Sequence, residues 1–316
     1  MDLFFLMLAI ALALVALISN MAWQRLYAET LHYHKAAINL AASSTKSTLD
    51  AQENLLQLIG DDLIDSDSLK DRAQSREILS KLIDNNPAIV GFGLASASGE
   101  LMLTSDNFPR DASLPNLASH PKTADSFRRT LNTEKMVIGR TYFMPSLERW
   151  VMPIRKTLRD DKGEILAVMT AGLSVSGENS FIDGYSQSGG DTTIMLVRED
   201  KHIQYVSSNY LEKYPDTYDT TVLDRVYQQV FVDLLDKGHP KFEVQRGKQV
   251  FDIEINNRYG QAQLVSIKYM PDHQLWVVAL TNKAELLSEF IKPFLIYSAC
   301  FIAFALVLLL LFRRIE

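Results

Sequence analysis

The chain contains two long stretches without a charged residue, Leu3 to Trp23 and Pro293 to Phe312. A helix of about 20 residues is roughly 30 Å long, which is the thickness of the hydrocarbon layer of a membrane. Arg313 and Arg314 directly follow the second stretch, and basic residues beside a span favour the cytoplasmic side. We therefore expect two transmembrane helices in a bacterial inner membrane, with the region between them in the periplasm.

Each stretch has an alternative interpretation. The first could be a cleaved signal peptide, but its apolar run is longer than usual and no Lys or Arg precedes it. The second could be a buried core helix, but a core seldom needs the run LVLLLLF followed directly by two arginines. Both stretches are therefore interpreted as uncleaved membrane spans.

The composition excludes several functions for the region between the spans. A formal net charge of −6 over 316 residues argues against nucleic acid as a partner. The single cysteine, Cys300, lies inside the second span, so the outer region can have neither a disulfide nor a thiol nucleophile. The sequence has no Gly-x-Ser-x-Gly or His-Glu-x-x-His motif. We expect no enzyme activity, metal or cofactor in this chain as given.

The segment from Gln24 to Leu58 has no Pro or Gly and favours a long helix that continues the first span. Small and apolar residues recur along it at steps of three and four, which is a heptad-like pattern: Leu26, Tyr33, Ala37, Leu40, Ser44, Ser47, Ala51, Leu55 and Leu58. Such a stripe suits helix pairing in a homodimer or packing against the chain's own sheet. Both interpretations remain open, and a helix this long can pair with a second copy at one height and pack against its own sheet at another.

Helical and strand patterns follow in two blocks, which indicates an α+β fold with antiparallel sheets. In the first block we expect helices over Ser68–Asp84 and Thr123–Asn132, and strands over Ala88–Ser96, Glu100–Ser105, Met136–Met144, Trp150–Leu158 and Glu164–Val175. In the second we expect helices over Val222–Lys237 and Ala284–Phe290, and strands over Thr192–Arg198, His202–Ser207, Lys241–Gln245, Gln249–Ile255, Gln261–Met270 and Gln274–Thr281. The second block thus repeats the first in outline.

This order of elements, with the stretch YFMPSLERWVMPIRKTLRDDKGEILAVMTAGL, resembles the double-Cache (tandem PAS-like) periplasmic sensor domain of bacterial transmembrane receptors. The resemblance is greatest to the domains found on diguanylate cyclases. It implies a transmembrane helix at 3–23, a stalk with the first helices at 24–86, a membrane-distal Cache module at 87–176, a linker at 177–190, a membrane-proximal Cache module at 191–283, an exit helix at 284–292 and a second transmembrane helix at 293–312. It also implies that the distal module holds a small molecule against its sheet, under the helical insert.

One version of the family binds amino acids through a Tyr, an Arg-x-Trp-Tyr motif and an Asp on the last strand. Tyr142 and Trp150 fit this pattern, but Glu148 and Val151 stand where Arg and Tyr are required, and Gly172 stands about where the Asp belongs. We therefore do not expect amino-acid sensing.

Five residues are the candidate ligand-binding residues: Arg140, Tyr142, Arg149, Trp150 and Arg155. Alternation along the strand places Trp150 on one face and both Arg149 and Arg155 on the other. In the same way, Arg140 and Tyr142 are expected to share one face of the preceding strand. The Trp150 side chain could pack in the hydrophobic core, or it could form a stacking wall over the ligand. Each arginine could form a surface salt bridge or bind an anion, because a carboxylate pairs bidentately with a guanidinium. We favour an anionic ligand such as an organic acid.

The sequence thus predicts a receptor in which a ligand in the periplasmic domain shifts the helices of a dimer and controls a cytoplasmic output. A diguanylate cyclase beyond Glu316 is the first expectation, on the resemblance alone, and a histidine kinase or chemoreceptor is the alternative. An adaptor that binds a periplasmic protein is a further alternative. Asp61, Asp62, Asp65 and Asp67 are interpreted as a solvated loop.

Overall fold

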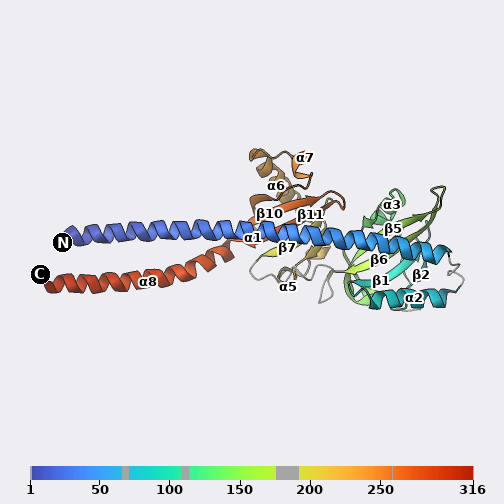
Figure 1. The fold of residues 1–316 in the computed structure, drawn as a ribbon, viewed down its shortest axis with the longest axis horizontal. Helices are drawn as coiled ribbons and strands as arrows, with labels where there is room; N and C mark the ends of the chain where they lie inside the picture. The colour runs from blue at the N-terminus through green and yellow to red at the C-terminus, as the bar shows by residue number, and fades with distance from the viewer. Residues whose placement is uncertain (1, 66–70, 109–113, 176–191, 258, 316) are drawn as a thin grey trace.

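The structure is a computed structural model that describes residues 2–65, 71–108, 114–175, 192–257 and 259–315. Two long helices run side by side at one end and two sheets lie at the other (Figure 1). Helix α1 (Asp2–Asp65) continues from the terminal region along both sheets, a length of about 96 Å at 1.5 Å per residue. Helix α8 (Lys283–Ile315) returns beside its first part. Both helices are long and apolar enough to cross a membrane.

The distal module contains the first antiparallel sheet. Its elements are α2 (Arg72–Asp84), β1 (Ile89–Ala95), β2 (Leu101–Thr104), α3 (Ala124–Leu131), β3 (Val137–Ile138), β4 (Tyr142–Met144), a 3₁₀ turn (Pro145–Leu147), β5 (Arg149–Arg159) and β6 (Ile165–Ser174). The strand order is β2-β1-β6-β5-β3, and β4 also pairs with β5. The β5–β6 hairpin turns at Asp160 to Gly163, where Gly163 has a φ of 84°, which glycine adopts readily.

The proximal module contains the second sheet. Its elements are β7 (Thr193–Arg198), β8 (Ile203–Val206), α5 (Ser208–Lys213), a 3₁₀ turn (Thr217–Asp219), α6 (Asp224–Asp236), α7 (Lys241–Val244), β9 (Phe251–Asn256), β10 (Ala262–Met270) and β11 (Leu275–Asn282). The order β8-β7-β11-β10-β9 matches that of the distal sheet. The predicted repeat and α+β fold with two antiparallel sheets are therefore confirmed.

Helix α1 covers one face of both sheets and buries a stripe of side chains against them: Ile38, Ala41, Leu49, Leu56 and Leu63. This stripe is offset from the predicted one, because Leu40 is 56% exposed and Leu58 is 70% exposed. Packing against the chain's own sheets is thus one role of the helix. The other predicted role, pairing with a second copy, would use the exposed face.

His34 is the buried polar residue by which α1 is fixed to the proximal sheet. Its Nδ1 lies 3.1 Å from Ser266 Oγ and its Nε2 lies 2.9 Å from Thr281 Oγ1. Burial lowers the pKa of His34 to about 4, although Asp252 nearby opposes the shift. The imidazole is therefore neutral at pH 7, and both ring nitrogens have a hydroxyl partner.

Four local predictions were wrong. Residues 61–65 end α1 instead of forming a loop, and α2 begins at Arg72, after the cap Asp71. The predicted strand over Met136–Met144 is interrupted between β3 and β4. The predicted strand over Lys241–Gln245 is the short helix α7, because so few residues cannot separate a period of two from one of 3.6. The predicted linker at 177–190 lies outside the described residues.

Candidate functional site

A cavity of about 670 Å³ lies over the distal sheet, on the face opposite α1. Because side chains alternate along a strand, Met152 and Ile154 of β5 pack toward α1 and Pro153 and Arg155 face the cavity. Glycine and small residues of the neighbouring strands complete the floor: Gly91, Gly93, Thr170 and Gly172. These small residues leave the space that the cavity occupies.

The walls of the cavity are mainly apolar. They come from the segments around Phe108, Leu117 and β4, and include Leu101, Phe108, Leu114, Pro115, Leu117 and Met144. The polar side chains Tyr142, His120 and Lys122 join them. Among the described residues, no Asp or Glu lines this cavity.

Arg155 is the buried cation of the cavity. It is 1% exposed, and its Nη1 donates to Ser126 Oγ at 2.6 Å. Its Nε is buried and has no hydrogen-bond partner among the described residues. Burial lowers the pKa of Arg155 to about 10, so the guanidinium still carries its charge at neutral pH. A buried cation without a carboxylate partner is costly in free energy unless a ligand pairs with it.

Tyr142, another predicted residue, also lines the cavity. Burial raises the pKa of its phenol, and the neighbouring charge of Arg155 opposes that rise only in part. The hydroxyl is therefore protonated at neutral pH and able to donate. Arg155 and Tyr142 are the two of the five candidates that this cavity brings together.

Trp150 lies elsewhere. It packs against the main core, with its ring centroid 5.6 Å from that of Phe143 and 5.0 Å from that of Tyr218 in the proximal module. The Tyr218 hydroxyl donates to Val175 O at 3.4 Å. Trp150 is thus a partly buried residue that packs against the core at the junction of the two modules. Arg149 is exposed and does not line the cavity.

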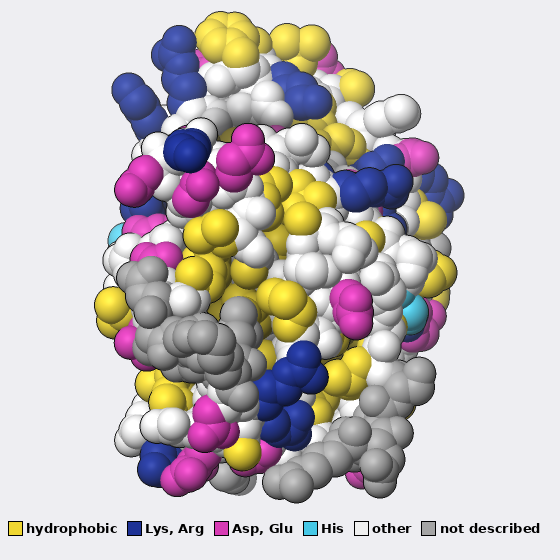
Figure 2. All heavy atoms as spheres, turned by 90° about the vertical axis from the view of Figure 1, so that its right-hand side faces the viewer, with side chains coloured by type: hydrophobic (Ala, Val, Ile, Leu, Met, Phe, Trp, Pro, Cys, Tyr) yellow, Lys and Arg dark blue, Asp and Glu magenta, His cyan; other side chains and the backbone are white. Residues whose placement is uncertain are grey.

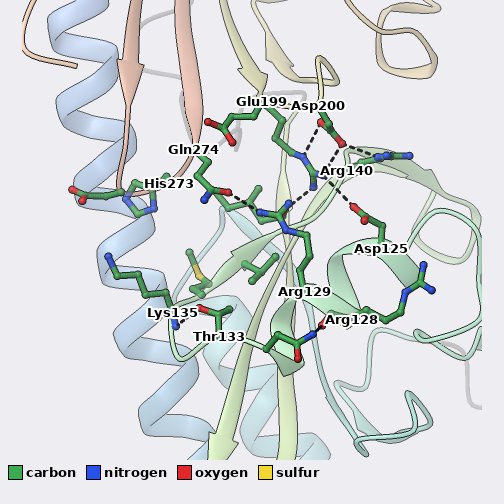
Figure 3. Close-up of a pocket in the computed structure, with 16 residues that line it drawn as sticks. Asp125, Arg128, Arg129, Thr133, Lys135, Arg140, Glu199, Asp200, His273 and Gln274 are labelled. Carbon is green, nitrogen blue, oxygen red and sulfur yellow. Dashed lines mark hydrogen bonds and ion pairs between the residues drawn. The ribbon is translucent and has the colours of Figure 1, made fainter. Parts of the chain in front are cut away.

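Arg140 lies in a different place, a cleft of about 750 Å³ between the two modules (Figure 3). Its Nε is 3.1 Å from Asp200 Oδ2. The prediction that Arg140 and Tyr142 share one strand face is wrong, because residues 139–141 are not part of a strand. The alternation of side chains holds only within a continuous strand.

Arg198 holds the two modules together beside this ion pair. Its side chain is buried, and Nη1 donates to Ile138 O at 2.8 Å while Nη2 contacts Asp200 at 2.7 Å and Asp125 at 3.3 Å. Burial alone would raise the pKa of Asp200, but hydrogen bonds from His202 and Arg198 outweigh it and hold that pKa well below its usual range. Arg129 adds a hydrogen bond to Gln274 at 2.8 Å (Figure 3).

Residues 138–142 form one connecting segment that touches both the cavity and the proximal module. Gly139 N donates to Pro153 O at 2.7 Å, behind the floor of the cavity. Thr141 Oγ1 donates to Gln204 O of β8 at 2.8 Å, and the next residue, Tyr142, lines the cavity. The segment therefore joins the cavity wall to the first hairpin of the proximal module.

Sequence reasoning missed Ser126, Arg198 and Asp200. Ser126 belongs to the short helix α3, and nothing in its neighbourhood marks it as the partner of Arg155. Arg198 ends β7 and Asp200 lies in the hairpin turn that follows, where charged residues are common and carry no specific signal.

No family model matches the chain, and no curated protein matches it. Solved structures do. One is the sensory domain of the Campylobacter jejuni chemoreceptor Tlp3 with isoleucine bound (12% identity, 84% of this chain and 97% of that chain, TM-score 0.53). Another is the sensor domain of the V. cholerae histidine kinase DctB (13% identity, 81% of this chain and 98% of that chain, TM-score 0.53). A third is the extracellular domain of soHK1S-Z6, described as a histidine kinase (14% identity, 85% of this chain and 99% of that chain, TM-score 0.59). The chain therefore has the two-module fold of these sensory domains.

Proposed function

We propose that this chain is the sensing part of a transmembrane receptor and that its distal cavity binds a small carboxylate with a mainly apolar body. The proposal rests mainly on the burial of the Arg155 guanidinium in this cavity. Within the described part of the chain, this fully buried guanidinium has a hydroxyl partner at Nη1 and none at Nε, and such a group can be paired bidentately by a carboxylate. The apolar walls provide the surface for the rest of the ligand.

The same cavity argues against an amino acid as ligand. An ammonium group in such a cavity needs a carboxylate partner, and the described lining offers none. Gly172, which stands about where the amino-acid pattern has an Asp, lies in the floor of the cavity. Tlp3 was solved with isoleucine bound, whereas the chemistry of this cavity favours an acid without the amine.

Binding would be transmitted through the connecting segment 138–142 to the proximal module. Strand β11 of that module ends at Asn282 and continues directly as α8. A ligand that prefers one of two arrangements by a few kcal/mol is sufficient for a useful switch. We place α1 and α8 across the inner membrane, the two modules in the periplasm, and a second copy against the exposed face of α1.

The cytoplasmic output is a further part of the proposal. The solved structures reported above come from a chemoreceptor and histidine kinases, which favours one of these outputs. The diguanylate cyclase expected from the sequence has no support from them.

Calorimetric titration of the full chain in lipid nanodiscs tests the ligand chemistry. We expect isovalerate to bind, and isovaleramide and leucine to bind at least tenfold more weakly, because the amide lacks the charge and leucine adds an unpaired ammonium. Arg155→Met should abolish isovalerate binding, and Arg149→Met, at an exposed site on the same strand, should leave it unchanged. Equal affinities for isovalerate and isovaleramide would contradict the proposal.

An adaptor that binds a periplasmic protein is the second candidate function. Figure 2 shows hydrophobic side chains gathered in the centre of the distal end, with charged side chains on both sides, and such a patch can contact a protein. The titration separates the two functions, because an adaptor needs no binding of small carboxylates by the purified chain.

A further inference from the structure

A second cavity lies in the proximal module, on the sheet face opposite α1. Its volume is about 140 Å³. Val230 and Phe231 of α6 form its roof, and Val265, Trp276 and Val278 of the two central strands contribute to its floor. This is the counterpart of the distal cavity, because both lie on the face that α1 leaves uncovered.

The two cavities differ in chemistry. Glycines and an arginine form the distal floor, whereas large apolar side chains form the proximal one. A cavity of about 150 Å³ lined by apolar side chains is known to hold benzene or xenon. The proximal cavity therefore has room for a molecule the size of one six-membered ring.

Trp276 lines this cavity, and its indole carries a buried donor that has no acceptor among the described residues. The residue is 4% exposed, and its Nε1 is buried without a hydrogen-bond partner. The indole ring is fixed by Tyr269, with ring centroids 4.6 Å apart, and by Phe231, at 5.7 Å. A buried indole N–H usually has an acceptor, and leaving it without one costs about 1–3 kcal/mol.

We propose that the proximal cavity is a second ligand site, for a small and mainly apolar molecule that carries one hydrogen-bond acceptor. The acceptor takes the hydrogen bond of Trp276 Nε1, and the apolar part of the molecule fills the space under α6. Trp276 and Val278 belong to β11, which continues into α8. An occupant thus contacts the strand that leads to the membrane. The site is independent of Arg155 and of the distal ligand.

Two probes of equal shape test the proposal: cyclohexanone, which has a carbonyl acceptor, and methylenecyclohexane, which has none. The full chain in nanodiscs, with ¹⁵N-labelled tryptophan, gives signals from three indoles, Trp23, Trp150 and Trp276. Trp276→Phe identifies the Trp276 signal. At matched free concentrations, we expect cyclohexanone to move the Trp276 indole proton downfield in a saturable way. Methylenecyclohexane should produce no downfield shift.

Two variants of α6 form a matched pair. Val230→Phe fills the cavity and should abolish the shift, whereas Val232→Phe, at a position 52% exposed, should preserve it. Unchanged Trp150 signals and thermal unfolding report that each variant is folded. Arg155→Met should leave the shift intact, which separates this site from the distal one. No shift at saturating cyclohexanone, the same downfield shift with both probes, or a shift that persists in folded Val230→Phe would each overturn the proposal.

Discussion

Arg140 Nε lies 3.1 Å from Asp200 Oδ2, so an ion pair joins the connecting segment of the distal module to the first hairpin of the proximal one. Asp200 also accepts from Arg198 at 2.7 Å. The two arginines differ in environment, because the Arg140 side chain is 37% exposed and that of Arg198 is 5% exposed. This difference determines how much each contact contributes to stability.

We expect Arg140→Ala to lower the free energy of unfolding by only about 0.2–1 kcal/mol, as for other exposed pairs. Asp200→Asn should cost more, on the order of 1–3 kcal/mol, because it leaves the buried charge of Arg198 with weaker partners. Thermal unfolding of the chain in nanodiscs measures both. A larger loss for Arg140→Ala than for Asp200→Asn would contradict this ranking.

Arg155→Met should stabilise the ligand-free chain while it abolishes carboxylate binding. The substitution removes a buried charge for which the described residues provide no carboxylate partner, and it puts an apolar side chain in its place. We expect a gain on the order of 1 kcal/mol or more. The exposed Arg149→Met is the control and should change the unfolding temperature little. A strongly destabilised Arg155→Met would mean that the guanidinium has a structural role.

Gly60→Ala should destabilise the chain although alanine is the better helix former by about 1 kcal/mol. A Cβ at Gly60 would lie 2.5 Å from Leu158 Cδ1, and Leu158 is fully buried. Overpacking of this kind costs about 1–3 kcal/mol. In a Leu158→Ala background the same change should become neutral or favourable. A double-mutant cycle on unfolding measures this, and additive effects would refute the steric explanation.

The buried His34 predicts a loss of stability in mild acid. Its pKa is about 4 in the folded chain and near 6.5 when unfolded, so the unfolded chain takes up the proton first as the pH falls. The free energy of unfolding is therefore unaffected by this titration above pH 6.5. It falls as the pH decreases toward 4, by roughly 3 kcal/mol in total. Unfolding measured across that window should show the slope.

His34→Asn should flatten this slope. Burial lowers the pKa of His273 as well, so His273→Asn is the control and removes only that residue's share. Asp200 titrates far below the window, since its pKa is depressed. An unchanged slope in His34→Asn would exclude His34 as the titrating group.

The proposed topology places the β5–β6 turn on the periplasmic side. Asp161 is exposed at this turn, and the chain's one cysteine can be removed by Cys300→Ser. In that background we expect Asp161→Cys to react with a membrane-impermeant maleimide in intact spheroplasts. Labelling only after lysis would place the two modules in the cytoplasm and refute the receptor topology.

Local patterns in the sequence were enough to predict the long first helix and the repeated hairpin-and-insert order. Each depends on the spacing of nearby residues. The predictions for two short segments were wrong because they, too, depended on local spacing. Lys241 to Val244 and the interrupted strand around Arg140 contain too few residues for a period to be recognised.

The sequence by itself determined the two apolar stretches, the order of the helices and strands along the chain, and the fact that Arg149 and Arg155 fall on the same face of one strand. Only the tertiary structure decided that Arg155 is buried under α3 and the cavity walls, that Arg149 is exposed, and that Arg140 pairs with Asp200, 60 residues away in sequence. The physical reason is that periodicity orients a side chain relative to its own strand. Its burial and its partners depend on segments that only the folded chain brings beside it.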